Sequence, residues 1–88
     1  MDKKGINVIE EILKKYNGES VVISTSHKLY GGNQKIKCNL NYIFDEERIG
    51  FKINEQEIFV YRNNFFNFGI EDGIYLADDL MEIKIKIV

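Results

Sequence analysis

The chain contains one histidine and one cysteine, His27 and Cys38, and these two residues are the best suited to nucleophilic catalysis. A thiol becomes a strong nucleophile when a base within hydrogen-bond reach takes its proton and a third group orients that base. The two residues fall on consecutive predicted strands, so a contact across a hairpin is one reading. The other is packing, because Cys38 alternates with Ile36 and Leu40 on an apolar face, where a thiol behaves as a small hydrophobe. We expect packing.

Other chemistries lack the residues that they need. A structural zinc site takes four nitrogen or sulfur ligands, which one histidine and one cysteine cannot supply. The acids gather in predicted turns, at residues 45–47 and 78–79, without the spacing of a calcium loop or of paired catalytic carboxylates. Gly31 and Gly32 join two predicted strands, so they lack the following helix that a phosphate loop requires. The sequence predicts a protein without catalytic residues, metal or cofactor, and therefore not an enzyme.

Aromatic side chains are concentrated in residues 58–69, IFVYRNNFFNFG, which hold five of the eleven in the chain. Such a cluster can stack on nucleic-acid bases, form a protein interface or fill a core. A core this small cannot take every ring, so we predict that Phe59 and either Phe66 or Phe68 are buried and that others are exposed. The predicted partner-binding residues are Tyr61, Arg62, Phe65, Tyr75, Asp78 and Asp79.

Charge is divided unevenly along the chain. The net charge is −2, but residues 1–44 carry seven lysines against four acids, whereas residues 45–88 carry five basic and ten acidic residues. Most of the non-specific affinity of a protein for nucleic acid comes from basic side chains that neutralise phosphates. The aromatic residues lie in the acidic half of the chain, so we expect their partner to be a protein with a basic surface. The alternative is a small barrel that binds nucleic acid through Lys28, Lys35 and Lys37. We expect nucleic acid to be the less suitable partner.

The elements that would position these residues follow from periodicity. Ile6, Ile9, Leu13 and Tyr16 recur at helical spacing and predict a helix over about residues 3–16. Alternating apolar residues and turn signals then predict strands from about residue 20 to residue 88.

One helix followed by five or six antiparallel strands predicts a single α+β domain, mostly β, over residues 1–88. We expect a small bent barrel, or a twisted meander, capped by the helix, and we favour the barrel. Residues 20–30 and 34–44 would each span about 36 Å if straight, so we expect them to bend, at a bulge near residues 24–26. The apolar run at residues 57–61 predicts a strand that is buried on both faces.

The last strand alternates isoleucines with charged residues. If it lies at a sheet edge, its free backbone groups can pair with another chain. This predicts a homodimer, or a structural subunit that assembles through the edge. The residues beside that interface would be Glu82, Lys84 and Lys86.

Composition also bears on location and origin. The N-terminal residues are too charged for a signal peptide, and no apolar run reaches the roughly 18 residues of a membrane span. A single cysteine fits a reducing compartment, so we expect a cytoplasmic protein that does not enter membranes. Abundant isoleucine, asparagine and lysine indicate an AT-rich genome. The prediction is a small regulator or inhibitor, from such a genome or a mobile element, that acts by protein–protein contact.

Overall fold

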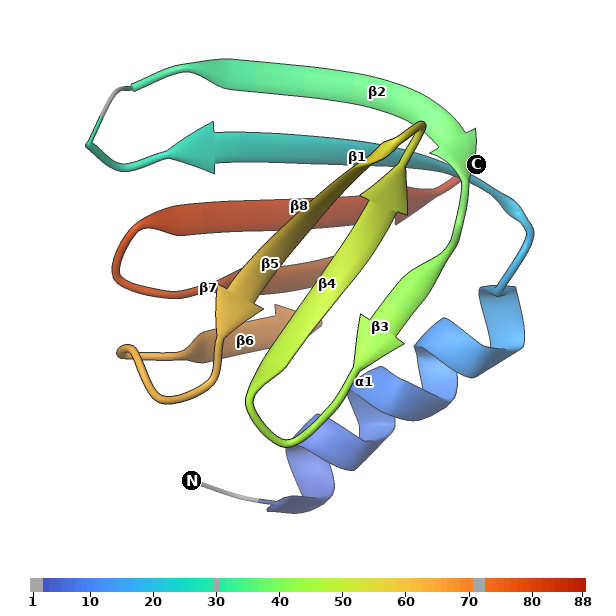
Figure 1. Cartoon of the computed structure of the whole chain (residues 1–88). Helices are drawn as coiled ribbons and strands as arrows, with labels where there is room; N and C mark the ends of the chain where they lie inside the picture. The colour runs from blue at the N-terminus through green and yellow to red at the C-terminus, as the bar shows by residue number, and fades with distance from the viewer. Residues whose placement is uncertain (1–2, 30, 71–72) are drawn as a thin grey trace.

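The computed structural model describes residues 3–29, 31–70 and 73–88. In this part the chain forms one helix and eight strands, which make a five-stranded and a three-stranded antiparallel sheet (Figure 1). The large sheet has the order β2-β1-β8-β7-β6 and the small sheet the order β3-β4-β5. The elements are α1 (Lys3–Tyr16), β1 (Ser20–His27), β2 (Asn33–Asn39), β3 (Tyr42–Phe44), β4 (Arg48–Ile53), β5 (Gln56–Tyr61), β6 (Asn67–Ile70), β7 (Ile74–Ala77) and β8 (Met81–Ile87).

The predicted α+β, mostly β class is confirmed, and the expected barrel is wrong. Among the described strands, none of the large sheet pairs with one of the small sheet, so the sheets do not close. The small sheet lies across the large one, and α1 runs along the side next to β3 (Figure 1). The strand count exceeds the expected five or six partly because one long predicted strand is divided between the two sheets.

The helix predicted over about residues 3–16 is confirmed, and the apolar residues that recur at helical spacing face the core. Ile6, Ile9 and Leu13 are buried, and the left-handed backbone of Gly18 (φ 86°) ends the turn that follows. The Gly18 N–H donates a hydrogen bond of 2.8 Å to the carbonyl oxygen of Leu40, which ties the end of α1 to the sheets. No helix formed by the described residues is both long and apolar enough to cross a membrane.

The chain passes from the large sheet to the small one at Leu40 and Asn41. The expected bulge near residues 24–26 is wrong, since Ser24 and Ser26 pair in regular register with Lys35 and Asn33. The described Cα atoms span 32, 30 and 24 Å along the principal axes. The predicted strand of residues 34–44 is not continuous, because the chain changes sheets between β2 and β3. Tyr30, at the end of the first predicted strand, lies outside the described residues.

The core lies between the two sheets and α1. Phe51, Ile49 and Val60 line it from the small sheet, and Ile83 and Ile85 line it from β8, as their alternation predicted. The other buried apolar residues of this cluster are Ile6, Ile9, Leu13, Val21, Ile23, Leu40, Ile53, Phe66, Ile74 and Leu76.

The predicted burial of β5 on both faces is wrong. This strand is an edge of the small sheet, and its outer face meets solvent. Val60 points into the core, whereas Glu57 is exposed and Phe59, expected in the core, is only half-buried on the outer side.

The prediction that the last strand is a free edge is also wrong. β8 lies in the middle of the large sheet and pairs with β1 on one side and β7 on the other (Figure 1). Its backbone groups are therefore occupied along the strand. A homodimer or a larger assembly cannot form by strand addition beside Glu82, Lys84 and Lys86, because the neighbouring strands already fill both positions.

The outer side of the small sheet is built around a glycine. Gly50 pairs with Phe59, and the ring lies over the glycine where a side chain would otherwise stand. The Arg48 guanidinium lies 4.2 Å from the centroid of the same ring, a cation–π geometry. A Cβ at position 50 would overlap both the ring and the carbonyl oxygen of Ile58.

Replacing this glycine should therefore destabilise the fold. We expect Gly50→Ala to lower the free energy of unfolding by about 1–3 kcal/mol, the usual cost of overpacking, as measured by urea denaturation. Gly69→Ala is the matched control, because a Cβ there has no neighbour within 4 Å. Equal losses in the two variants would show that the ring over Gly50 is not the cause.

Candidate functional site

The register of β1 and β2 separates the two candidate catalytic residues. Cys38 pairs with Val21, six residues before His27, which places them about 20 Å apart at the usual rise of a strand. Burial also raises the pKa of the Cys38 thiol, so less of it is ionised at neutral pH. The two residues cannot form a catalytic pair, and Cys38 packs against the core as expected.

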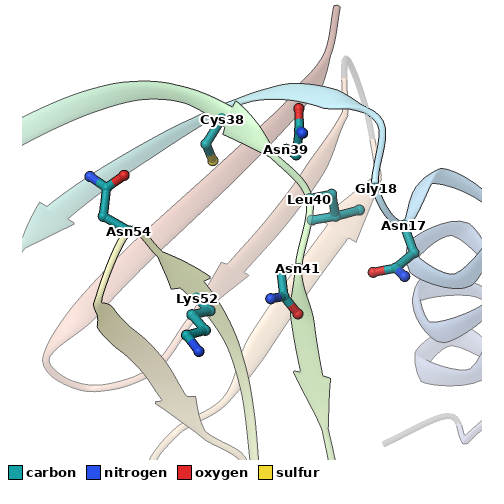
Figure 2. Close-up of a pocket in the computed structure, with 8 residues that line it drawn as sticks. All are labelled: Asn17, Gly18, Cys38, Asn39, Leu40, Asn41, Lys52 and Asn54. Carbon is teal, nitrogen blue, oxygen red and sulfur yellow. The ribbon is translucent and has the colours of Figure 1, made fainter.

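A polar hollow of about 530 Å³ lies where the end of α1, the crossover from β2 to β3 and the β4–β5 turn meet. Its lining, drawn in Figure 2, consists of Asn17, Gly18, Cys38, Asn39, Leu40, Asn41, Lys52 and Asn54. Cys38 and Lys52 are its two titratable side chains, and four neutral asparagines surround them. No group of three or more potential metal ligands occurs among the described residues. The residues that line the hollow include no histidine or carboxylate that could act as a base toward the thiol.

A single buried carboxylate organises the opposite part of the molecule. Asp78 is the one charged residue that is buried among the described residues, at 2 % exposed. Its Oδ1 accepts hydrogen bonds of 2.8 Å from the backbone N–H groups of Leu80 and Met81. Its Oδ2 accepts one of 2.9 Å from the N–H of Tyr61, and its carbonyl oxygen accepts one of 2.6 Å from the ammonium of Lys28. Asp78 thus connects the β7–β8 turn to the end of β5 and to the residues after β1.

Backbone hydrogen bonds reinforce this connection. The N–H of Asp79 donates to the carbonyl oxygen of Asn64 at 2.9 Å, and that of Lys28 donates to the carbonyl oxygen of Leu80 at 2.8 Å. The connections that follow β1, β5 and β7 consequently lie at one end of the molecule, on the left in Figure 1.

Four large apolar side chains of the described structure are exposed on these connections or, for Tyr61, at the end of β5 where one begins, and we call them the loop-end patch. They are Leu29 (69 % exposed), Tyr61 (46 %), Phe65 (89 %) and Leu80 (42 %). Phe65 also has a left-handed backbone, with φ at 55°. This conformation costs a bulky residue roughly 1–2 kcal/mol, and strain of this kind concentrates at functional positions. The fold holds an almost fully exposed ring in a conformation that the ring itself disfavours.

Acidic groups border the loop-end patch. Asp79 is exposed beside it. Arg62 donates from its backbone N–H to the carbonyl oxygen of Glu47, and from its guanidinium to that of Asp45, both at 2.8 Å. The acidic turn of residues 45–47 is therefore fixed next to the patch. Hydrogen bonds from the backbone N–H groups of Arg48 and Glu47 lower the pKa of the Asp45 carboxyl, which keeps it ionised.

The structure brings together only some of the predicted partner-binding residues. Tyr61, Phe65 and Asp79 lie at the loop end, and Arg62 connects that end to the acidic turn. Asp78 is beneath the surface, so it positions the loops and cannot contact a partner. Tyr75 lies elsewhere, on the outer face of the large sheet, where its hydroxyl donates a 3.0 Å hydrogen bond to Glu82.

The sequence reasoning missed Leu29 and Leu80. Both lie outside the strands, Leu29 after the end of β1 and Leu80 between β7 and β8, and Leu29 continues the alternation of β1, so the sequence pattern gave no signal that it is exposed. The lysines that were predicted to bind nucleic acid are also divided, because the ammonium of Lys28 is bound to Asp78 while Lys35 and Lys37 lie on β2.

Comparisons with protein-family models, curated proteins and solved structures found no significant match to this chain.

Asp78 can be tested as the residue that holds the loops. Asp78→Ala would leave three backbone N–H groups without their acceptor, so we expect the free energy of unfolding to fall by about 2–4 kcal/mol in urea denaturation. Asp79→Ala is the adjacent control, and its side chain is exposed, so a change within about 0.5 kcal/mol is expected. Similar effects of the two substitutions would contradict the role of Asp78.

The environment of Cys38 predicts a sluggish thiol. Because burial raises its pKa, the native protein should react with a disulfide reagent at pH 8 more slowly than the same protein unfolded in urea. Absorbance of the released thiolate measures both rates. A native rate equal to or above the unfolded rate would contradict a packing role and point to an activated nucleophile.

Proposed function

We propose that this protein is a non-enzymatic, cytoplasmic binding module that contacts another protein through the loop-end patch. The observation that carries the proposal is Phe65, whose ring is 89 % exposed on a strained, left-handed backbone. A domain of this size has few apolar side chains to leave in solvent. A ring held outside the core against its own conformational preference is best explained by a partner that covers it.

The chemistry of the patch describes that partner. Aromatic residues and leucines would form the dry centre of the interface, and the acids beside them would form its polar rim. The rim is negative, through Asp79 and the acidic turn of residues 45–47, so it complements a basic surface around an apolar pocket. Regulators and inhibitors encoded by mobile elements or AT-rich genomes are the class that we propose.

Asp78 contributes by fixing the shape of the patch before binding. Its carboxylate accepts hydrogen bonds from the backbone N–H groups of Tyr61 and Leu80. Its carbonyl oxygen accepts one from Lys28, the residue before Leu29. Loops that are already ordered lose less conformational entropy when a partner binds, and the association is stronger for that reason.

Phe65→Gly separates a binding role from a packing role. Glycine adopts the left-handed backbone without strain, so the free energy of unfolding should stay unchanged or rise by up to about 1 kcal/mol. Affinity capture from a nuclease-treated host lysate should retain a partner on the wild-type protein and lose it on Phe65→Gly.

Val88→Gly serves as the control for capture, because Val88 is an exposed apolar residue outside the loop-end patch. Its partner retention should match that of the wild-type protein. The proposal fails if Phe65→Gly retains the same proteins, or if its stability falls by more than about 1 kcal/mol while capture is unaffected.

A further inference from the structure

The outer face of the large sheet gathers lysines from both halves of the chain. Ser24 of β1 pairs with Lys35 of β2 on one side and with Lys84 of β8 on the other. Val22 likewise lies between Lys37 and Lys86. The residues that flank these positions along β1 and β8 are buried or half-buried, and Val21, Ile23, Ile83 and Ile85 belong to the core, so the lysines and their β1 neighbours point away from it. We call this surface the open sheet face.

The spacing of these lysines suits a chain of negative charges. Lys35 and Lys84 are two strand spacings apart, about 10 Å, and Lys35 and Lys37 are about 7 Å apart along β2. The side chains of Lys35, Lys37 and Lys84 make no ion pair with any residue in the described ranges. Lys86 takes part in another interaction and is not counted with these three.

The five strands carry very little negative charge. Within their described bounds the one acidic residue is Glu82, and it accepts the hydrogen bond of the Tyr75 hydroxyl. The net charges of residues 1–44 and 45–88 made nucleic acid the less suitable partner. They do not describe this face, because β8 belongs to the acidic half of the chain and contributes lysines. The order of the strands in the sheet, and not the order of residues along the chain, determines the charge of this face.

An aromatic ring and a hollow lie next to the lysines. Tyr75 is in register with Lys84 on one side and with Gly69 on the other. Gly69 has no side chain, and a Cβ at this position would have no neighbour within 4 Å, so the space beside the glycine is open. A hollow of about 670 Å³ opens here, and Val22, Ser24, Gly69, Gly73, Tyr75 and Lys84 are among the residues that line it. The hollow gives a planar group access to the tyrosine.

We infer that the open sheet face binds single-stranded nucleic acid. Phosphates would bind Lys35, Lys37 and Lys84, and a base would stack on Tyr75 in the adjoining hollow. Sheets that bind single strands combine a positive track for the backbone with an accessible ring for a base. Tyr75 is half-buried, and the hollow that it lines gives a base access to it. In a duplex the bases are paired and stacked internally, so it could use the lysines but not the ring. The open sheet face is separate from the loop-end patch and acts independently of it.

Fluorescence anisotropy with a labelled oligothymidylate of about 12 nucleotides tests this inference. Three phosphate contacts predict affinity that falls about twentyfold when salt rises from about 50 to about 200 mM. Lys35→Glu/Lys84→Glu should weaken binding at least about tenfold. Lys14→Glu/Lys52→Glu changes the net charge equally outside the open sheet face, and its affinity should stay within about twofold of the wild-type value.

The tyrosine has its own pair of variants. Tyr75→Ala should weaken binding about tenfold, and Tyr75→Phe should bind as the wild-type protein does, because stacking needs the ring and not the hydroxyl. Phe65→Gly should leave oligonucleotide binding unchanged, which keeps this test distinct from that of the loop-end patch. Circular dichroism verifies that each variant is folded.

Several results would overturn the inference. One is the lack of an anisotropy change at low salt, and another is an equal loss of affinity in the two double-lysine variants. Tyr75→Ala binding as tightly as Tyr75→Phe would remove the stacking contact, and equal affinity for a duplex of the same length would remove the preference for single strands. Binding to anionic lipid vesicles in place of the oligonucleotide would assign the face to a membrane surface.

Discussion

The pairing of β8 with both β1 and β7 is the contact on which the rest of the molecule depends. It joins the N-terminal hairpin to the C-terminal strands, and its inward residues, Ile83 and Ile85, complete the core. The same alternation sends Lys84 to the opposite face, beside lysines that are far away in sequence. It also sets the β7–β8 turn next to the end of β1, where Lys28 and Leu80 share a hydrogen bond. Both proposed surfaces follow from this one pairing, one at the end of the strands and one on their outer face.

The two surfaces differ in how the fold prepares them. The loop-end patch consists of irregular backbone, which would be mobile without fixed contacts, and the buried carboxylate of Asp78 supplies those contacts. The open sheet face needs no such device, because the hydrogen bonds of five strands hold its side chains at regular spacings. The buried carboxylate of the loop-end patch and the strand hydrogen bonds of the open sheet face have the same effect, because each reduces the conformational entropy that is lost on binding.

Local patterns predicted the elements well and their arrangement poorly. The helix, the buried isoleucines of the last strand and the exposure of Tyr61 and Phe65 all follow from periodicity or from the limited size of the core. The order of the strands does not, because an inner strand and an edge strand can share the same alternation. The change of sheet at Leu40 left no signal either, since the same residue parity faces the core before and after it. Asp78 was misread because its hydrogen bonds with Tyr61 and Lys28 join residues that are distant in sequence. An acid pair in a turn also resembles a solvated surface.

The small sheet joins only consecutive strands, β3 to β4 and β4 to β5, through short turns. The large sheet, in contrast, cannot assemble until β8 has been synthesised and has returned to β1. Closing a long loop costs more entropy than closing a hairpin, and non-local pairing of this kind slows folding. Residues 42–61 are therefore suited to form native structure early, while β1 and β2 wait as an isolated hairpin with one apolar side uncovered. During synthesis this hairpin is the segment most in need of protection from aggregation.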